Sequence, residues 1–175
     1  MTDAQIQTAL QGWIVQKLVP ATTANTLYFI FLPPNVVSLA LGQKSCGTPK
    51  GYCGYHFNAG NVYYAVIAFA NCLGCQFDGD FLDTLTEASS HELAEAVTDP
   101  QGNGWFDPAS GDEIGDLCNR QAVRMGGFLV QTEWSNAQGV CAFQPGNLFP
   151  NWLEIDENPA SAAIVTEGEN LYQLP

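Results

Sequence analysis

One predicted helix constrains the fold of this chain more than any other stretch. Asp80 is a good N-cap residue and Asp83 lies in the first turn, so a helix is expected to begin there. Pro100 disfavours helical geometry at Asp99, so the helix is expected to end at about Thr98. Apolar residues recur along it at helical spacing, namely Phe81, Leu82, Leu85, Ala88, Ala96 and Val97. A helix with such a stripe needs another layer to pack against.

That layer is expected from short runs of strand-forming residues on both sides of the helix. The candidate strands are residues 26–32, 36–41, 62–69 and 128–134. A second helix is expected over about residues 4–18, with Asp3 as its N-cap and Pro20 past its end. Strands before and after one long helix predict an α+β fold, with a mixed sheet packed on that helix.

The length and charge of the chain limit the number of domains and the kinds of partner that we expect. Residues 1–143 are predicted to form a single domain, and the polar, acidic residues 144–175 an irregular C-terminal wrap of it. The chain has 5 basic and 18 acidic residues, for a formal net charge of −13. Its basic residues form no dense cluster, so we expect neither nucleic acid nor an anionic membrane surface as a partner. No apolar run reaches the roughly 18 residues of a membrane span.

The cysteines point to an oxidising compartment. Six cysteines form an even set with close spacings, which favours disulfides. Sequence proximity suggests the pairs Cys46–Cys53 and Cys72–Cys75, and elimination then leaves Cys118–Cys141. The N-terminus lacks the features of a signal peptide, so we interpret the chain as a mature secreted protein whose signal has been removed. The alternative is a reduced intracellular protein.

The predicted long helix also carries candidate metal ligands. Residues four apart on a helix share a face, about 6 Å apart along the axis. His91 and Glu95 could therefore bind one metal ion, with Glu92 beside them as a base. This is the spacing of the H-E-x-x-H metallopeptidase helix, with glutamate in place of the second histidine. The alternative is an ordinary solvated helix face, because Glu and Ala are good helix formers.

A zinc site needs a third protein ligand and an open position for water. Asp99 is too far from His91, at about 12 Å along a straight helix. The third ligand is therefore expected beyond Pro100, from Asp107, Asp112, Glu113 or Asp116. Asp116 is the preferred candidate and Glu113 the second, because a disulfide at Cys118 would hold the segment around Asp116 rigid. Zn²⁺ is the expected ion, and the oxygen ligands leave Ca²⁺ or Mn²⁺ as alternatives.

Four segments of the chain together resemble the microbial relatives of the plant EXORDIUM (phosphate-induced) proteins. These segments are residues 90–100, 104–107, 113–118 and 130–135. The Cys-x-x-Cys before the helix fits the same resemblance, which spans about residues 25–143. It implies a secreted protein of zincin-like fold, with a metallopeptidase site in those members that retain His-Glu. The plant members are associated with growth and the cell wall and look non-catalytic.

The function predicted from these features is metal-dependent hydrolysis of a peptide or protein substrate. An ion held by His91, Glu95 and Asp116 would polarise the scissile carbonyl, and Glu92 would take a proton from the bound water. His56, Tyr63 and Arg124 are candidates for the donor that stabilises the oxyanion, and His56 is equally explained as a structural residue. The alternative function is a non-catalytic secreted binding or cell-wall module with a structural metal.

Overall fold

A computed structural model describes residues 1–47, 51–69, 72, 75–76 and 80–143; the predicted C-terminal wrap lies outside these residues. The helices are α1 (Asp3–Val15), α2 (Phe81–Thr98) and the short 3₁₀ helix η1 (Asp116–Cys118). The strands before α2 are β1 (Leu27–Phe31), β2 (Leu39–Ala40), β3 (Gln43–Ser45), β4 (Gly51–Tyr52), β5 (Gly54–Ala59) and β6 (Val62–Ile67). The strands after it are β7 (Ala122–Met125), β8 (Phe128–Gln131), β9 (Glu133–Ser135) and β10 (Val140–Ala142). The fold is α+β, as the sequence predicts.

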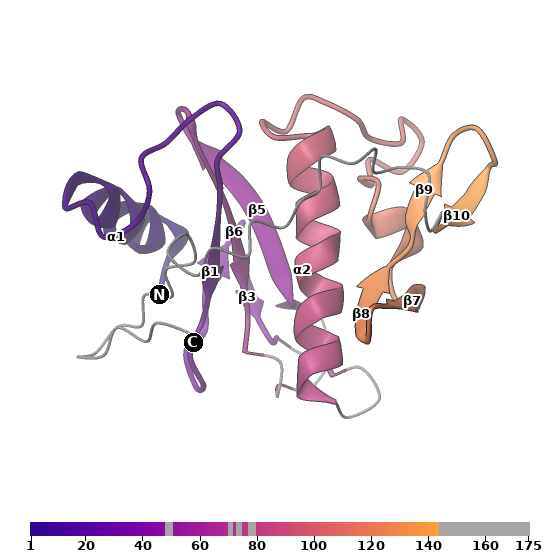
Figure 1. Ribbon diagram of the computed structural model, residues 1–175, viewed down its shortest axis with the longest axis horizontal. Helices are drawn as coiled ribbons and strands as arrows, with labels where there is room; N and C mark the ends of the chain where they lie inside the picture. The colour runs from indigo at the N-terminus through magenta and orange to yellow at the C-terminus, as the bar shows by residue number, and fades with distance from the viewer. Residues whose placement is uncertain (48–50, 70–71, 73–74, 77–79, 144–175) are drawn as a thin grey trace.

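The main sheet has the strand order β1-β6-β5, with β1 parallel and β5 antiparallel to β6. Helix α1 covers one face of this sheet and α2 the other (Figure 1). On the α1 side, Ile6 and Leu10 pack with Tyr28, Tyr64 and Val66 into the hydrophobic core. The central position of β6 explains its composition, because both faces of this strand are covered.

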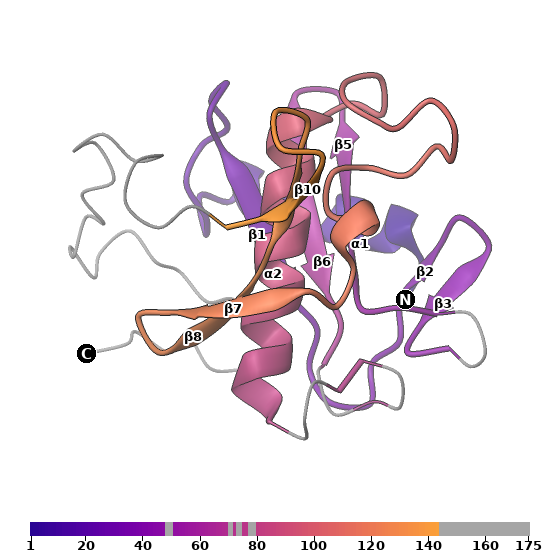
Figure 2. The same cartoon turned by 90° about the vertical axis from the view of Figure 1, so that its right-hand side faces the viewer.

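Helix α2 lies between two layers. The main sheet contacts it through β5 and β6, and β8 contacts it from another side. Figure 2 shows β7 and β8 crossing α2 on the side away from the sheet. The helix begins at the predicted cap, where Asp80 Oδ1 accepts the Leu82 N–H at 2.8 Å, and it ends at Thr98 as predicted. Because α2 is enclosed in this way, its middle turns are withdrawn from solvent.

The apolar stripe predicted for α2 does not face the interior. Phe81, Leu82 and Val97 are among its exposed residues. Ala88 is the one member of the stripe that is buried, and the other buried residues of the helix are Asp83, Thr84, Glu87, Glu92 and Glu95. Charged side chains are almost never buried without partners, so the partners of these carboxylates need to be identified.

The N-terminal helix is shorter than predicted and has a different cap. It ends at Val15, and Thr2 is the N-cap in a capping box with Gln5. Asp3 was the wrong choice because its carboxylate accepts hydrogen bonds from the hydroxyls of Tyr55 and Tyr64, at 2.9 and 2.7 Å. The Asp3 side chain, which a local pattern assigned to the helix cap, is thus engaged in a long-range contact with the sheet.

Three disulfides staple the chain: Cys46–Cys72, Cys53–Cys75 and Cys118–Cys141. The pairing Cys118–Cys141 is confirmed, and the two pairings predicted from proximity are wrong. Cys46 and Cys53, which lie between β3 and β5, bond to Cys72 and Cys75 in the stretch between β6 and α2. Tertiary packing, and not closeness in the sequence, brings the paired Cα atoms to 5.5 and 5.4 Å from each other. No described helix is long and apolar enough to cross a membrane.

Candidate metal centre

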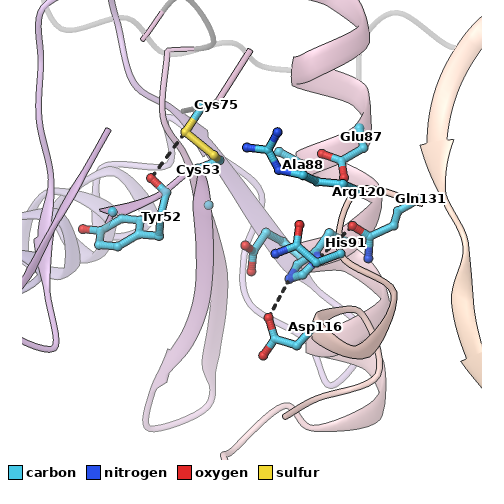
Figure 3. Close-up of a pocket in the computed structure, with 13 residues that line it drawn as sticks. Tyr52, Cys53, Cys75, Glu87, Ala88, His91, Asp116, Arg120 and Gln131 are labelled. Carbon is cyan, nitrogen blue, oxygen red and sulfur yellow. Dashed lines mark hydrogen bonds and ion pairs between the residues drawn. A yellow bond between two sulfur atoms is a disulfide. The ribbon is translucent and has the colours of Figure 1, made fainter. Parts of the chain in front are cut away.

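His91, Glu95 and Asp116 converge on one point beside α2. His91 Nε2 lies 3.1 Å from Glu95 Oε1 and 3.7 Å from Asp116 Oδ1. The three ligand atoms all lie within 4.8 Å of one another. Two ligands of a tetrahedral zinc ion, each about 2.1 Å from it, are roughly 3.4 Å apart. The group therefore has the dimensions of a metal site, and Figure 3 shows His91 and Asp116 directed toward each other.

The 3₁₀ helix η1 places Asp116 and also fixes Glu95. The Asp116 N–H donates to Glu95 Oε1 at 3.1 Å. Asp116 therefore holds the Glu95 carboxylate through its backbone and adds its own carboxylate to the ligand group. Two positions further along, Cys118 is fully buried and bonded to Cys141 in β10. The disulfide thus anchors η1, as the choice of Asp116 assumed.

Gln131 at the end of β8 orients the His91 ring. Its Nε2 donates to the Gly115 carbonyl at 2.8 Å, which turns its Oε1 toward His91 Nδ1 at 3.1 Å. The Gln131 N–H donates in turn to Ser90 Oγ at 2.8 Å. Nδ1 therefore carries a proton, and Nε2 is the nitrogen that faces Glu95 and Asp116. Metal-ligating histidines have this arrangement, with the second ring nitrogen held by an outer partner.

Replacing Gln131 by methionine is expected to weaken Zn²⁺ binding by about 10- to 100-fold, because the His91 ring loses its outer partner. Competition with a chromophoric chelator would measure the change in affinity. Gln138→Met, at an exposed turn between β9 and β10, is the matched control and should leave the affinity unchanged. Equal affinities in the two variants would show that Gln131 does not orient a metal ligand.

Two glycines allow the backbone to approach the site closely. A Cβ on Gly115 would lie 2.9 Å from His91 Nδ1 and 3.0 Å from Glu95 Oε1. A Cβ on Gly54 would lie 2.6 Å from Glu92 Oε1 and 2.8 Å from Glu92 Cγ. Real Cβ contacts are essentially never this short, so a side chain at either position would force these neighbouring side chains to move. Neither residue was singled out from the sequence, because a glycine's neighbours become visible only in the fold.

Gly54→Ala is expected to lower the free energy of unfolding by about 1–3 kcal/mol, because the new methyl group displaces the buried Glu92 side chain. Denaturant unfolding would measure this loss. Gly12→Ala in α1 is the control, since its Cβ would make only an ordinary contact at 3.7 Å from Gln16 Nε2. There the exchange should instead stabilise the helix by about 1 kcal/mol. A Gly54→Ala protein as stable as the wild type would mean that Glu92 has room to move.

Glu92 lies between the main sheet and the group formed by His91, Glu95 and Asp116. Its residue is 3% exposed, and its Oε2 has no hydrogen-bond partner among the described residues. Burial raises the pKa of Glu92, while the facing His56 imidazole and the charge of His91 oppose the rise. The side chain lines a cavity of about 260 Å³ together with His91 and Asp116. A buried carboxylate with a raised pKa beside open space is suited to accept a proton.

His56 in β5 belongs to the site, and it is the only one of the three candidate oxyanion donors that lines a cavity described here. Its Nδ1 lies 3.6 Å from Glu92 Oε2 and 3.7 Å from Glu95 Oε2. Tyr63 accepts a hydrogen bond from Gln101, and Arg124 is ion-paired with Asp83. The sequence offered little signal for His56, because its strand was not predicted.

The two imidazoles and the buried carboxylates stabilise one another's charges. Burial alone lowers the pKa of His56, but the facing carboxylates of Glu92 and Glu95 outweigh it and raise this pKa to about 10. Burial likewise lowers the pKa of His91, and Glu95 raises it to about 10. For Glu95, burial is outweighed by hydrogen bonds from His56 and His91, which lower its pKa to about 2. Glu95 is thus the shared anion between two histidines.

The other carboxylates considered as third ligand are placed differently. Asp99 accepts the N–H groups of Asn103 and Gly104 on Oδ1, both at 2.6 Å, so it shapes the turn after α2. Asp107 binds Ser110 in an exposed loop and, like Asp112, lies outside the groups of converging ligand atoms found among the described residues. Glu113 Oε1 lies 3.7 Å from His56 Nε2, on the opposite side of that ring from Glu92.

Comparison of the chain with protein-family models, with curated proteins and with solved structures found no match.

Proposed function

We propose that this protein is a secreted, metal-dependent peptidase of zincin-like architecture, related to the microbial EXORDIUM-like proteins. One observation carries the proposal: Glu92 is buried, its Oε2 has no hydrogen-bond partner within the described part of the chain, and it lies directly beside the group His91, Glu95 and Asp116. Zinc is bound in proteins by histidine nitrogen and by carboxylate oxygen, and three protein ligands leave a position for water. The same donors would accept Mn²⁺ or Ca²⁺.

In the proposed reaction the protein's residues hold a water and move its proton. His91, Glu95 and Asp116 would hold a zinc ion, which would supply Lewis acidity toward the scissile carbonyl and lower the pKa of a bound water. Glu92 accepts that proton and later delivers it to the leaving amine. Gln131 keeps His91 Nε2 directed at the ligand group, while a proton on His56 Nδ1 holds Glu92 and Glu95 in place. A peptide substrate would enter through the cavities that these side chains line.

The extracellular setting is part of the proposal. Three disulfides fit an oxidising compartment. The acidic surface, with a net charge of −13, favours neither nucleic acid nor anionic lipid as a partner. All residues of the candidate site fall within the predicted domain 1–143.

The second candidate is a non-catalytic secreted binding or cell-wall module, in which the metal is structural. The ion pairs of His56 and His91 with Glu95 favour it, because they stabilise the fold whether or not chemistry follows. Both candidates use the same three ligands. They differ at Glu92, which is needed as a base in the first and is not needed as a base in the second.

Metal content and peptide cleavage, measured side by side, test the proposal. After dialysis against metal-free buffer, the wild-type protein is expected to retain about one zinc per chain and to cleave a mixed peptide library. His91→Ala and Asp116→Ala should lose both properties. Asp112→Ala is the matched control and should retain both, since Asp112 lies outside the ligand group. Zinc without cleavage would support the structural module, and no zinc in the wild type would overturn both candidates.

A further inference from the structure

Glu95 has a histidine on each side. Its Oε1 lies 3.1 Å from His91 Nε2, and its Oε2 lies 3.7 Å from His56 Nδ1. The two histidines come from α2 and β5, so the packing of helix on sheet creates this arrangement. A carboxylate with one imidazole nitrogen at each oxygen is placed as a bridge between two ions.

The atoms on the His56 side form a group of their own. His56 Nδ1 lies 3.6 Å from Glu92 Oε2 and 3.7 Å from Glu95 Oε2. The ligand atoms of these three residues all lie within 4.8 Å of one another. These separations match those of ligands around one divalent cation, at roughly 3.4 Å.

The His56 ring is oriented in the same manner as the His91 ring. His56 Nε2 lies 3.1 Å from the Asp99 carbonyl oxygen, which is only an acceptor, so Nε2 carries a proton. Nδ1 is then the nitrogen directed at Glu92 and Glu95. Asp99 O thus does for His56 what Gln131 does for His91, and both rings direct the remaining nitrogen toward Glu95.

One buried oxygen of this group, Glu92 Oε2, lacks a hydrogen bond among the described residues. The Glu92 side chain is 4% exposed and is aimed at the group, and an unpaired buried carboxylate oxygen costs free energy that a bound cation would offset. A cavity of about 500 Å³, lined by His56, Glu92, Glu95 and Glu113, opens the group to solvent.

We propose that His56, Glu92 and Glu95 form a second divalent-cation site, with Glu95 bridging it to the site of His91 and Asp116. Glu113 lies near Nε2, on the other side of the His56 ring, and is not a member of this ligand group. Binding there replaces the proton on His56 Nδ1 by the ion and engages the Glu92 carboxylate. Glu92 can then no longer accept a proton from water, so the second ion inhibits hydrolysis. This inhibition rests on the proposed function, whereas the binding itself does not.

Calorimetric titration of the metal-stripped protein with Zn²⁺ alone tests the binding. The wild type is expected to take up two ions and His56→Gln only one. The dissociation constant of that one ion should lie within about threefold of the wild-type value for the first ion. Asn58→Ala is the control, because Asn58 lines the same cavity but lies outside the ligand group. A single ion in the wild type, or two in His56→Gln, would overturn the proposal.

A measurement on the unmodified protein covers the case in which His56→Gln does not fold. Two Mn²⁺ ions bridged by one carboxylate are magnetically coupled, so the second equivalent should diminish the electron paramagnetic resonance signal of the first. Additive signals would argue against a shared Glu95. Peptide cleavage measured in the same zinc titration should rise to one equivalent and fall beyond it. Binding of two ions without cleavage would support the second site and reject the peptidase. Cleavage with only one bound ion would support the peptidase and reject the second site.

Discussion

Glu92→Gln is expected to reduce peptide hydrolysis by about 10²- to 10⁴-fold, because the amide cannot accept the proton of the attacking water. The first zinc equivalent should remain bound, since Glu92 is not among His91, Glu95 and Asp116. Initial rates at saturating peptide, together with zinc content, measure the two effects. Hydrolysis at the wild-type rate in Glu92→Gln would remove Glu92 from the role of base.

Glu87→Gln is the control for this substitution. Glu87 lies on the same buried face of α2, is 6% exposed, and lines the same cavity as His91. Burial raises the pKa of Glu87 as it does that of Glu92. Glu87 is not, however, a member of either ligand group. The control should therefore retain most of the activity, which separates the loss of a base from the loss of a buried charge.

The stability of Glu92→Gln should move in the opposite direction from its activity. Glu92 is buried, and its Oε2 has no hydrogen bond from any residue that the structure describes, so ionisation of this side chain costs folding free energy. The neutral amide removes that cost, and the thermal midpoint should stay equal or rise. A large fall in the midpoint would instead show that the carboxylate supports the fold.

The metal-free protein is expected to lose stability as the pH rises from about 5 to about 10. His56 and His91 have folded-state pKa values of about 10, above the ordinary 6.5, so their contribution is complete below pH 6.5 and disappears toward pH 10. Burial raises the pKa of Glu113 to about 7 and that of Glu133 in β9 to about 8. Through these two carboxyl groups the free energy of unfolding also falls, as the pH rises from their ordinary pKa of 4.5 through those values.

At low pH the direction reverses. The pKa of Glu95 is lowered to about 2 from 4.5, so its contribution is present above pH 4.5 and is lost as the pH falls toward 2. The free energy of unfolding of the metal-free protein should therefore be highest near about pH 5. Urea unfolding between pH 3 and 10, after treatment with a chelator, measures this profile.

Saturating zinc is expected to reverse the loss at high pH. Metal binding displaces protons from the imidazole nitrogens, so the affinity rises over the range in which the protons leave. A ligand that binds only the folded state raises its free energy of unfolding by about 4 kcal/mol at a thousand times its dissociation constant. The difference between the zinc-bound and metal-free proteins should thus widen from pH 6 to pH 9. A constant difference would mean that zinc does not compete with these protons.

Local patterns in the sequence were sufficient for the main elements of the fold. The helix from Asp80 to Thr98, the strands around residues 27–31 and 62–67, and the α+β class all followed from caps, proline positions and apolar runs. They were predictable because each depends on residues within a few positions of one another. The spacing of His91 and Glu95 is of the same kind, since helix geometry alone places them on one face.

Properties that depend on distant segments were not predictable in this way. The apolar stripe of α2 was assigned inward, whereas its carboxylates are the buried face. Two of the three disulfide pairings were wrong, and Asp3 was assigned to a cap although it binds Tyr55 and Tyr64. In each case a contact across the fold outweighed a local preference, and no local pattern contains that contact.

The candidate site divides along the same line. The sequence by itself determined the helix that carries His91, Glu92 and Glu95, because the hydrogen bonds of a helix are local. Only the tertiary structure brought His56 from β5, Asp116 from η1 and Gln131 from β8 to that helix. Their positions are set by the packing of sheet, helix and hairpin, in which residues 40 apart meet within hydrogen-bonding distance. Spacing in the chain carries no information about such contacts.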